Sequence, residues 1–347
     1  MLDYMELKNN DGDKIYVKFR AFEPKDAAAA VNCVRDEYGD KYHKRMMYDE
    51  NYIIEQCKTG KLSLYVAETK DGKIIGTLGF RRDLPKDTSC NITTGIMLKE
   101  YRGYHTFFPF TKYIAEKIRR LNDASAICCR LILYHDITQK RMYRAGLRPC
   151  GFVPSMIMAQ NFQHSYDRDE NKKLTLGLMV RRMKKQNAGV IYVPQIHKET
   201  AQKIYDSLRV ECDIRETGSP LAGISEISSV QDERQKTAFV DIENSGEDLA
   251  KRMEALHAKF ADDGQTFNIM LNISDEKSIA AYEVLKSMGY FFAGFKPICG
   301  VHEIMILHNP GNVSINFDTL KLIPPFAELK DYVKKCYESR CVKENER

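Results

Sequence analysis

The stretch "EYRGYHTFFPF", residues 100–110, has residue types that suit a binding site. It follows the apolar segment "GIML" and leads into a basic, helix-like segment, with Arg102 and Gly103 between the two. The N-terminus of a helix has unpaired backbone N–H groups and a partial positive charge, so a preceding loop that carries an arginine can hold a phosphate. These residues predict an anion-binding turn.

Two common phosphate-binding motifs are absent, because the sequence has neither the P-loop pattern nor the GxGxxG pattern after a strand. What remains is an apolar strand, a polar turn and a helix. Thr106 is expected to cap this helix, and Pro109 fits its first turn. The apolar residues of the helix share one face: Phe107, Phe110, Ile114, Ile118 and Leu121. The alternative is an ordinary strand-to-helix connection with a solvated arginine.

An internal repeat indicates how the surrounding elements are organised. "GLRPCGFVP" at residues 146–154 and "GYFFAGFKP" at residues 289–297 share the pattern G-x4-G-F-x-P. Each follows an apolar strand-like run and then a helix-like stretch. A second echo begins at Ile15 and Ile191, where "IYV" precedes a break and a helix. The chain therefore reads as a duplicated domain whose second copy is shorter.

Both copies read as mixed α/β units. In the first copy, alternating apolar residues on both sides of Asp71-Gly72 predict a hairpin, because that dipeptide tolerates the positive φ of a tight turn. The predicted fold class is α/β of the α+β kind, with two tandem domains that each have a mixed, mostly antiparallel sheet flanked by helices. The predicted limits are 12–185 for the first domain, 190–310 for the shortened second domain, and 311–347 for an extension with a terminal helix.

Composition limits the classes of function. The net charge of +5 comes from 53 basic and 48 acidic residues spread along the chain, which predicts neither nucleic-acid nor membrane binding. The ten cysteines have no CxxC pair or Cys/His ligand spacing, so we expect reduced thiols and no metal site. No apolar run is long enough to span a bilayer and no signal peptide is recognisable, which predicts a cytoplasmic protein.

The order of elements over residues 12–165 resembles the GCN5-related N-acetyltransferase family, and the second copy looks like a degenerate repeat of the same fold. In that family a turn of Arg or Gln, two residues, Gly, one residue, and Gly or Ala binds the pyrophosphate of acetyl-coenzyme A through its amides. Arg102 matches the first position and Gly103 a glycine that often follows it. His105 and Phe107 stand where the family has small residues.

The resemblance implies which residues contact the acyl donor. Met97, Leu98 and Lys99 match the strand segment whose backbone pairs with the pantetheine arm. The resemblance also implies that the turn contacts the donor. The residues so implied are Arg102, Gly103, Tyr104, His105, Thr106 and Phe107 of the turn, and Asp136 in the region after the next strand.

The resemblance also implies catalytic roles. Direct transfer to an amine needs a base for the amine proton and an acid for the departing thiolate. His135 follows a strand where the sheet should open and has the best position among the candidate bases. The other candidates are His105, Glu68, Asp83 and Glu100. Tyr143 is a candidate acid if the helix register differs by one, because Met142 occupies the family's tyrosine position.

Two hypotheses follow. The first is an N-acetyltransferase that moves an acetyl group from acetyl-coenzyme A to a small-molecule or peptide amine, with a non-catalytic second copy. The second is a non-catalytic acyl-coenzyme A-binding or regulatory protein that keeps the fold, and His105 and Phe107 motivate it. The sequence leaves the acceptor, the preferred acyl chain and the oligomeric state open.

Overall fold

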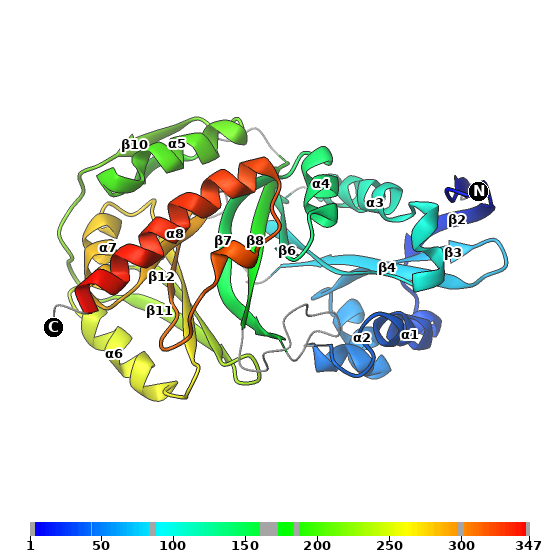
Figure 1. Ribbon diagram of the computed structural model, residues 1–347, viewed down its shortest axis with the longest axis horizontal. Helices are drawn as coiled ribbons and strands as arrows, with labels where there is room; N and C mark the ends of the chain where they lie inside the picture. Colours follow the sequence, from blue (N-terminus) through cyan, green and yellow to red (C-terminus); the bar gives the residue numbers. More distant parts are fainter. Residues whose placement is uncertain are drawn as a thin grey trace. The chain divides into compact units, whose positions relative to one another are not determined.

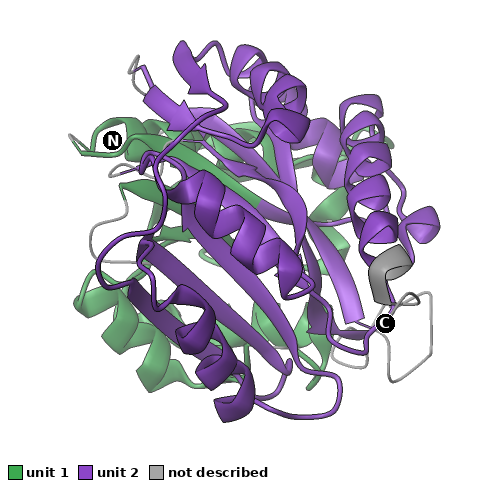
Figure 2. Cartoon of the chain, turned by 90° about the vertical axis from the view of Figure 1, so that its left-hand side faces the viewer, with its two compact units in different colours: residues 1–129, 160–165 green, residues 130–159, 166–347 purple. Residues whose placement is uncertain are grey.

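The computed structural model describes residues 4–42, 44–82, 88–121, 123–159, 173–183, 187–297 and 302–344, with side chains up to residue 340. The described residues divide into two compact units: those up to Cys129 form unit 1, and those from Arg130 onward form unit 2 (Figure 2). The division falls inside one strand, so the domain limits at 12–185, 190–310 and 311–347 stay a prediction.

Unit 1 is a sheet of strand order β1-β2-β3-β4-β5-β6, antiparallel except for the parallel pair β5 and β6. Helices α1 and α2 lie on one face and α3 on the other (Figure 1). The strands are β1 (Met5–Lys8), β2 (Lys14–Ala21), β3 (Ser63–Thr69), β4 (Ile74–Arg81), β5 (Ser89–Met97) and β6 (Ala126–Ile132). The helices are α1 (Ala27–Tyr38), α2 (Glu50–Lys58) and α3 (Phe107–Arg119).

Two predicted local elements of unit 1, the hairpin and the buried face of the amphipathic helix, are confirmed. The hairpin between β3 and β4 turns at Gly72, whose φ of 85° suits glycine in a tight turn. Helix α3 buries Phe110, Ile114 and Ile118, as their spacing predicts, and the ring of Phe110 stacks on Phe19 of β2 at 4.6 Å. The N-terminal strand β1, which pairs with β2, was not predicted.

Unit 2 contains a mainly antiparallel sheet of order β8-β7-β14-β15-β13-β12-β11, with a parallel pair β12 and β13 and a separate parallel pair β9 and β10. Its first strands are β7 (Arg148–Met158), β8 (Lys173–Arg182), β9 (Gly189–Tyr192), β10 (Cys212–Arg215) and β11 (Glu226–Asp232). The later strands are β12 (Thr237–Asn244), β13 (Thr266–Asn272), β14 (Phe291–Lys296) and β15 (Ile304–Asn309). The helices are α4 (Ile137–Arg144), α5 (Lys198–Ser207), α6 (Leu249–Lys259), α7 (Ser278–Ser287) and α8 (Pro324–Glu344).

The two copies of the G-x4-G-F-x-P repeat meet in this sheet. Gly151 of β7 lies opposite Gly294 of β14. A Cβ atom on Gly294 would lie 2.2 Å from the Cα of Gly151, so the strands can approach this closely only without a side chain there. The following residues of the repeat, Phe152 and Phe295, are fully buried. The repeated glycines therefore allow β7 and β14 to pack backbone to backbone.

His197 joins three helical elements of unit 2 and is fully buried. Tyr332 of α8 donates its hydroxyl hydrogen to the carbonyl of Ile196 at 2.5 Å, so its oxygen can accept from Nδ1–H of His197 at 2.7 Å. Nε2 of His197 then accepts from the hydroxyl of Tyr282 in α7 at 2.9 Å. This arrangement requires a neutral imidazole, and burial lowers the pKa of His197 from 6.5 to about 3.

We expect acid to destabilise the protein partly through His197. Because its folded-state pKa lies below its unfolded value, the unfolded chain takes up the proton first as pH falls through 6.5, so stability is lost between pH 6.5 and 3. Lowering the pH from 7.5 to 5.5 should cost about 1.4 kcal/mol through this group. Urea unfolding at both pH values measures it. His197→Gln, which keeps a donor and an acceptor, should lose that share of the pH dependence, and an unchanged dependence would contradict the assignment.

Candidate functional site

The predicted anion-binding turn connects β5 to α3 in unit 1 through the short helix η3 (Lys99–Tyr104). Strand β5 carries an irregularity just before this turn. Thr77 pairs with Ile96 but Gly79 pairs with Thr93, and the intervening Thr94 has a φ of 51°. Such a β-bulge interrupts the ladder and re-aims the strand. The residue types around Thr94 do not predict this bulge.

The bulge leaves polar groups of β5 in an unusual environment. The hydroxyl of Thr77 donates to the carbonyl of Thr94 at 2.9 Å, which takes the place of a ladder bond. The hydroxyl of Thr94 itself is buried and has no hydrogen-bond partner among the described residues. Buried polar groups are usually satisfied, so this orphan hydroxyl indicates a place where a ligand or water can bind.

Residues 97–99, the strand segment expected to bind the acyl donor, form hydrogen bonds with other groups of unit 1. The amide of Leu98 donates to the carbonyl of Ile75 at 2.9 Å, and the amide of Lys99 donates to Oδ2 of Asp36 at 2.9 Å. The carbonyl of Met97 accepts from Nε of Arg102 at 3.3 Å. Two of the three amides are therefore occupied by the chain's own groups.

Arg102 points along the turn toward helix α1. Its guanidinium forms an ion pair with Glu37, and 42% of the Arg102 side chain remains exposed. Gly103 follows it in η3, where a Cβ atom would meet only the Cβ of Asn9, at 3.7 Å. The turn is therefore not crowded at Gly103, and Arg102 already has an anionic partner in Glu37.

The start of α3 differs from the prediction at Thr106. The side chain of Thr106 makes no capping hydrogen bond, because its backbone is in the right-handed helical region (φ −58°, ψ −30°) rather than the extended region of a capping residue. Its hydroxyl is buried without a partner, and its amide has no backbone acceptor among the described residues. Together with the N–H groups that any helix N-terminus leaves unpaired, these groups fit an anion.

His105 and Phe107, the two residues that replace small ones, have different surroundings. His105 adopts a left-handed φ of 56°, a conformation that favours glycine, and its Nε2 lies 3.1 Å from Oδ1 of Asn10. The ring of Phe107 packs on β5, since a Cβ atom on Gly95 would lie 3.2 Å from its Cε2. The ring of Tyr104 lies beside that of Tyr101, tilted by 37°, with ring centroids 6.2 Å apart.

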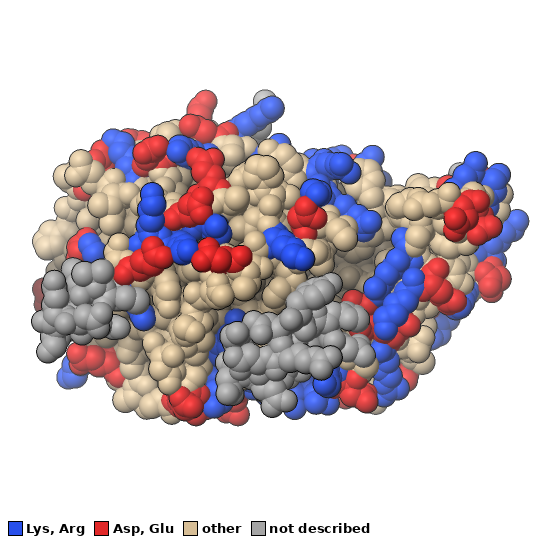
Figure 3. Space-filling view, in the orientation of Figure 1, with Lys and Arg blue, Asp and Glu red and all other residues tan. Residues whose placement is uncertain are grey.

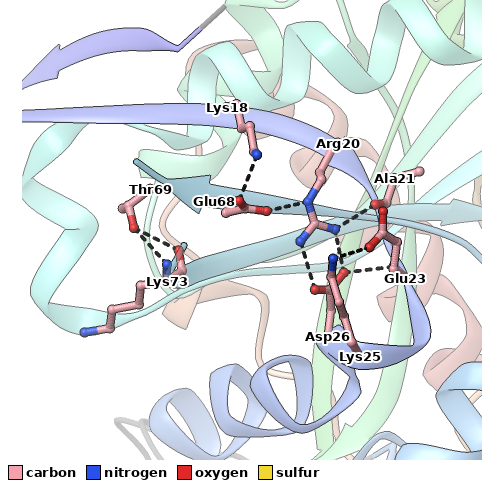
Figure 4. Close-up of polar contacts among 9 residues, drawn as sticks. All are labelled: Lys18, Arg20, Ala21, Glu23, Lys25, Asp26, Glu68, Thr69 and Lys73. Atoms are coloured by element: carbon pink, nitrogen blue, oxygen red, sulfur yellow. Dashed lines mark hydrogen bonds and ion pairs between the residues drawn. The ribbon is translucent and has the colours of Figure 1, made fainter. Parts of the chain in front are cut away.

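Glu68, a candidate base, belongs to a partly buried ionic cluster at the start of α1 (Figure 4). Lys18 contacts its Oε1 at 2.8 Å, and Nε of Arg20 donates to its Oε2. Arg20 also holds Asp26 with two hydrogen bonds of 2.6 and 2.9 Å. Burial would raise the pKa of Glu68, but the hydrogen bonds from Lys18 and Arg20 outweigh it and the pKa is lowered. A carboxylate held by two cations is a poor proton acceptor, and its role here is structural.

The remaining acidic candidates contribute little. Glu100 pairs with Lys73 at 2.7 Å, and Asp83 lies outside the described residues.

The other predicted residues lie in unit 2, around the start of α4. His135 is half-buried, and burial lowers its pKa. Its Nδ1 is buried with no partner among the described residues, so a neutral imidazole here could accept a proton. The neighbouring Asp136 pairs with Lys140 at 2.5 Å, and this hydrogen bond lowers the pKa of Asp136.

Tyr143 lies on the outer side of α4. Its side chain is 37% exposed, and the guanidinium of Arg148 lies 4.3 Å from its ring centroid. Met142 is the buried residue of this pair. The helix register thus turns Met142 inward and Tyr143 outward.

Unit 2 contains a second strand-turn-helix segment, from β12 to α6, and the chain itself fills that turn. The amide of Glu247 donates to the carbonyl of Gly223 at 3.1 Å, and the amide of Gly246 donates to Oγ of Ser225 at 2.9 Å. The amide of Ser225 donates to Oδ1 of Asp248 at 2.7 Å. We call residues 216–225 the strap. In this turn the strap accepts hydrogen bonds from the backbone amides that an anion would otherwise bind.

The strap also contacts the turn before α7. The amide of Ser219 donates to the carbonyl of Glu276 at 3.0 Å, and a Cβ atom on Gly218 would lie 2.0 Å from the same oxygen. The strap therefore extends from the N-terminus of α7 to that of α6 within unit 2. The sequence alone did not predict the strap, because its contacts join segments that are distant along the chain.

Neither the surface charge on the face drawn in Figure 3 nor the metal-ligating side chains of the described residues form a further site. On the face drawn in Figure 3, Lys and Arg are interspersed with Asp and Glu. Within the described part of the chain there is no cluster of His, Cys, Asp or Glu that could hold a metal ion, and no disulfide joins the cysteines whose side chains are described. None of the described helices is both long and apolar enough to cross a membrane.

Comparisons with known proteins find similarity only among solved structures. No family model and no curated protein matches the sequence. One similar structure is a chimera of the spermidine N-acetyltransferase SpeG from Vibrio cholerae and hSSAT, with 12% identity, 48% of this chain and 96% of that chain covered, and a TM-score of 0.38. Another is an N-acetyltransferase from Staphylococcus aureus Mu50, with 11% identity, 48% and 99% coverage, and a TM-score of 0.39. Both similarities cover about half of this chain.

Proposed function

We propose that the chain is an N-acetyltransferase that transfers an acetyl group from acetyl-coenzyme A directly to an amine. The observation that carries the proposal is the end of β5 in unit 1. A bulge at Thr94 precedes a turn with Arg102, and the turn leads to the buried, unpartnered hydroxyl of Thr106 at the N-terminus of α3. A strand with free polar groups beside an anion-binding helix terminus suits a ligand with an extended arm and a phosphate group.

In this proposal unit 1 binds the donor. Met97, Leu98 and Lys99 would lie along the arm. The pyrophosphate would be held by the turn, through Arg102, Gly103, Tyr104, His105, Thr106 and Phe107. Asp136 of unit 2 is kept in the proposed set on the family resemblance alone. Because the amides of Leu98 and Lys99 already have acceptors, the donor's arm would depend on other groups of β5 or displace those bonds.

The chemistry needs a proton acceptor and a thiolate partner. The amine nitrogen attacks the thioester carbonyl, the carbon–sulfur bond breaks, and the amine loses a proton. We assign the base to His135, whose lowered pKa and unpartnered Nδ1 suit a neutral acceptor. Tyr143 is the proposed acid, and this assignment rests on the family resemblance alone.

We further propose that residues 190–310 are a degenerate copy of the domain at 12–185, with 311–347 as an extension. The support is the repeated pattern of a parallel strand pair separated by a helix, β5-α3-β6 and β12-α6-β13. The strap supports a non-catalytic second copy, because it occupies the turn before α6.

Replacing Arg102 by alanine should weaken binding of acetyl-coenzyme A by about tenfold, the effect of losing one charge-assisted contact to phosphate. Isothermal calorimetry on the full chain measures this. Lys112→Ala, on the exposed side of α3, is the control and should bind like the unmodified protein. Unchanged affinity in Arg102→Ala would place the donor elsewhere, and no binding by the unmodified protein at millimolar ligand would reject the proposal.

A specific observation favours a second candidate, a non-catalytic acyl-coenzyme A-binding protein. The ring of Phe107 lies on β5 at Gly95, one residue after the bulge, in the space beside the strand. Thiol release with a broad panel of amines decides between the two. Release with any amine would reject the binding protein, and donor binding without release would favour it.

A further inference from the structure

We propose that Glu37 is an internal competitor for the anion-binding turn of unit 1, so that a phosphate-bearing ligand must displace it from Arg102. The inference rests on the proposed function and concerns the regulation of the same site. Two consecutive acidic residues of α1 contact the turn. Glu37 pairs with the guanidinium of Arg102, and Asp36 accepts the amide of Lys99 at 2.9 Å.

The position of these two carboxylates is determined by the core of unit 1. Helix α1 buries Ala30, Val31 and Val34 in a cluster that also contains Leu98, with Tyr101 packed against it. The last turn of α1 and the beginning of the anion-binding turn therefore share one hydrophobic core. Asp36 and Glu37 are thus presented to the turn by packed residues, and an approaching anion does not find Arg102 unoccupied.

The exposure of the pair determines that Glu37 can be displaced. Of the two side chains, Arg102 is 42% exposed and Glu37 is 20% exposed. Oε2 of Glu37, the atom of the pair, is itself buried, so solvent screens the attraction from the side of the guanidinium. A partly exposed ion pair of this kind changes an equilibrium by roughly two- to fivefold. A pyrophosphate carries more negative charge than one carboxylate and also reaches the helix N-terminus, so it can replace Glu37 at a moderate loss of affinity.

The turn of unit 2 provides a contrast. There the carbonyl of Gly223 and Oγ of Ser225 accept the amides of Glu247 and Gly246. A Cβ atom on Gly246 would lie 2.5 Å from Gly223 O, Ile224 C and Ser225 N. The strap is part of the backbone, so it can leave this turn only if residues 216–225 move. We therefore assign the displaceable competitor to unit 1 only.

The experiment measures the affinity of the full chain for acetyl-coenzyme A and for inorganic pyrophosphate by calorimetry. Glu37→Gln keeps the size of the side chain, removes its charge, and should tighten binding of both ligands by roughly two- to fivefold. Asp40→Asn removes one charge from an exposed residue just after α1 and is the matched control, which should leave affinity nearly unchanged. In the Arg102→Ala background the gain from Glu37→Gln should disappear, because the competition acts through Arg102.

Each outcome decides between the inference and the proposed function. Equal or weaker binding by Glu37→Gln, with binding by the unmodified chain intact, would overturn the competitor and leave the proposed function standing. The same gain with and without Arg102 would mean simple repulsion and would also overturn it. Binding that appears only in Glu37→Gln supports the competitor. If neither protein binds either ligand, both the proposed function and the inference fail.

Discussion

Gly294→Ala is expected to lower the free energy of unfolding by about 3–5 kcal/mol, because overpacking of about 1–3 kcal/mol adds to backbone strain of about 1–3 kcal/mol. The added Cβ would lie 2.2 Å from the Cα of Gly151 and 2.6 Å from the carbonyl oxygen of Cys150. Both are backbone atoms, so the strands β7 and β14 must separate. Gly294 also has a φ of 146°, which side chains rarely adopt. Thermal and urea unfolding followed by circular dichroism measure the loss.

Gly289→Ala is the matched control for this effect. Gly289 is the first glycine of the same repeat and has a positive φ of 87°, but a Cβ atom there would meet only Nδ2 of Asn309, at 3.5 Å. The control therefore keeps the backbone strain and lacks the collision, and should cost about 1–2 kcal/mol. Equal losses of stability in the two variants would show that the close approach of β7 and β14 does not explain why the second position of the repeat is glycine.

Gly246→Ala is expected to release the strap from the turn before α6 and to cost about 2–4 kcal/mol of stability. Its Cβ would lie 2.5 Å from three backbone atoms of residues 223–225, and the strap is the segment that can move away. Its release breaks the hydrogen bonds from Gly246 and Glu247 to the strap. Thermolysin cleaves before leucine and isoleucine, so cleavage before Leu221 and Ile224, mapped by mass spectrometry, should become much faster.

Gly223→Ala tests whether the effect comes from the collision. Gly223 lies on the strap with a φ of 74°, and a Cβ atom there would meet nothing within 4 Å. It should cost only about 1–2 kcal/mol of backbone strain and leave the strap attached. If Gly246→Ala leaves proteolysis of residues 216–225 unchanged, the strap is not held by this turn, and the argument for a closed second site falls.

The sequence could predict the elements because their signals are local. Apolar spacing predicted which face of α3 is buried, and Asp71-Gly72 predicted the hairpin, since helix periodicity and turn chemistry are contained in short windows. The G-x4-G-F-x-P repeat predicted equivalent positions in two strands. The mixed, mainly antiparallel α/β architecture followed from the order of these elements.

The candidate site could be predicted only in part. Arg102 was recognised by its type and its place before a helix, but its partner Glu37 was not, because their contact depends on how α1 packs on the sheet. Thr106 was expected to cap α3, yet a capping residue needs an extended backbone and the tight turn gives it helical angles. Glu68 was a reasonable base by type alone. Its two cationic neighbours come from strand pairing, which no local pattern reveals.

By itself, the sequence determined helix α3, the hairpin of β3 and β4, the repeat and the position of a polar turn before an amphipathic helix, because these depend on neighbouring residues. The tertiary structure alone decided which groups of that turn are free. The bulge at Thr94, the hold of Glu37 on Arg102, the strap in unit 2 and the meeting of Gly151 with Gly294 all join residues brought together by sheet order and helix packing. Such contacts depend on the free energy of the whole packed unit, so the residue types of a short segment do not predict them.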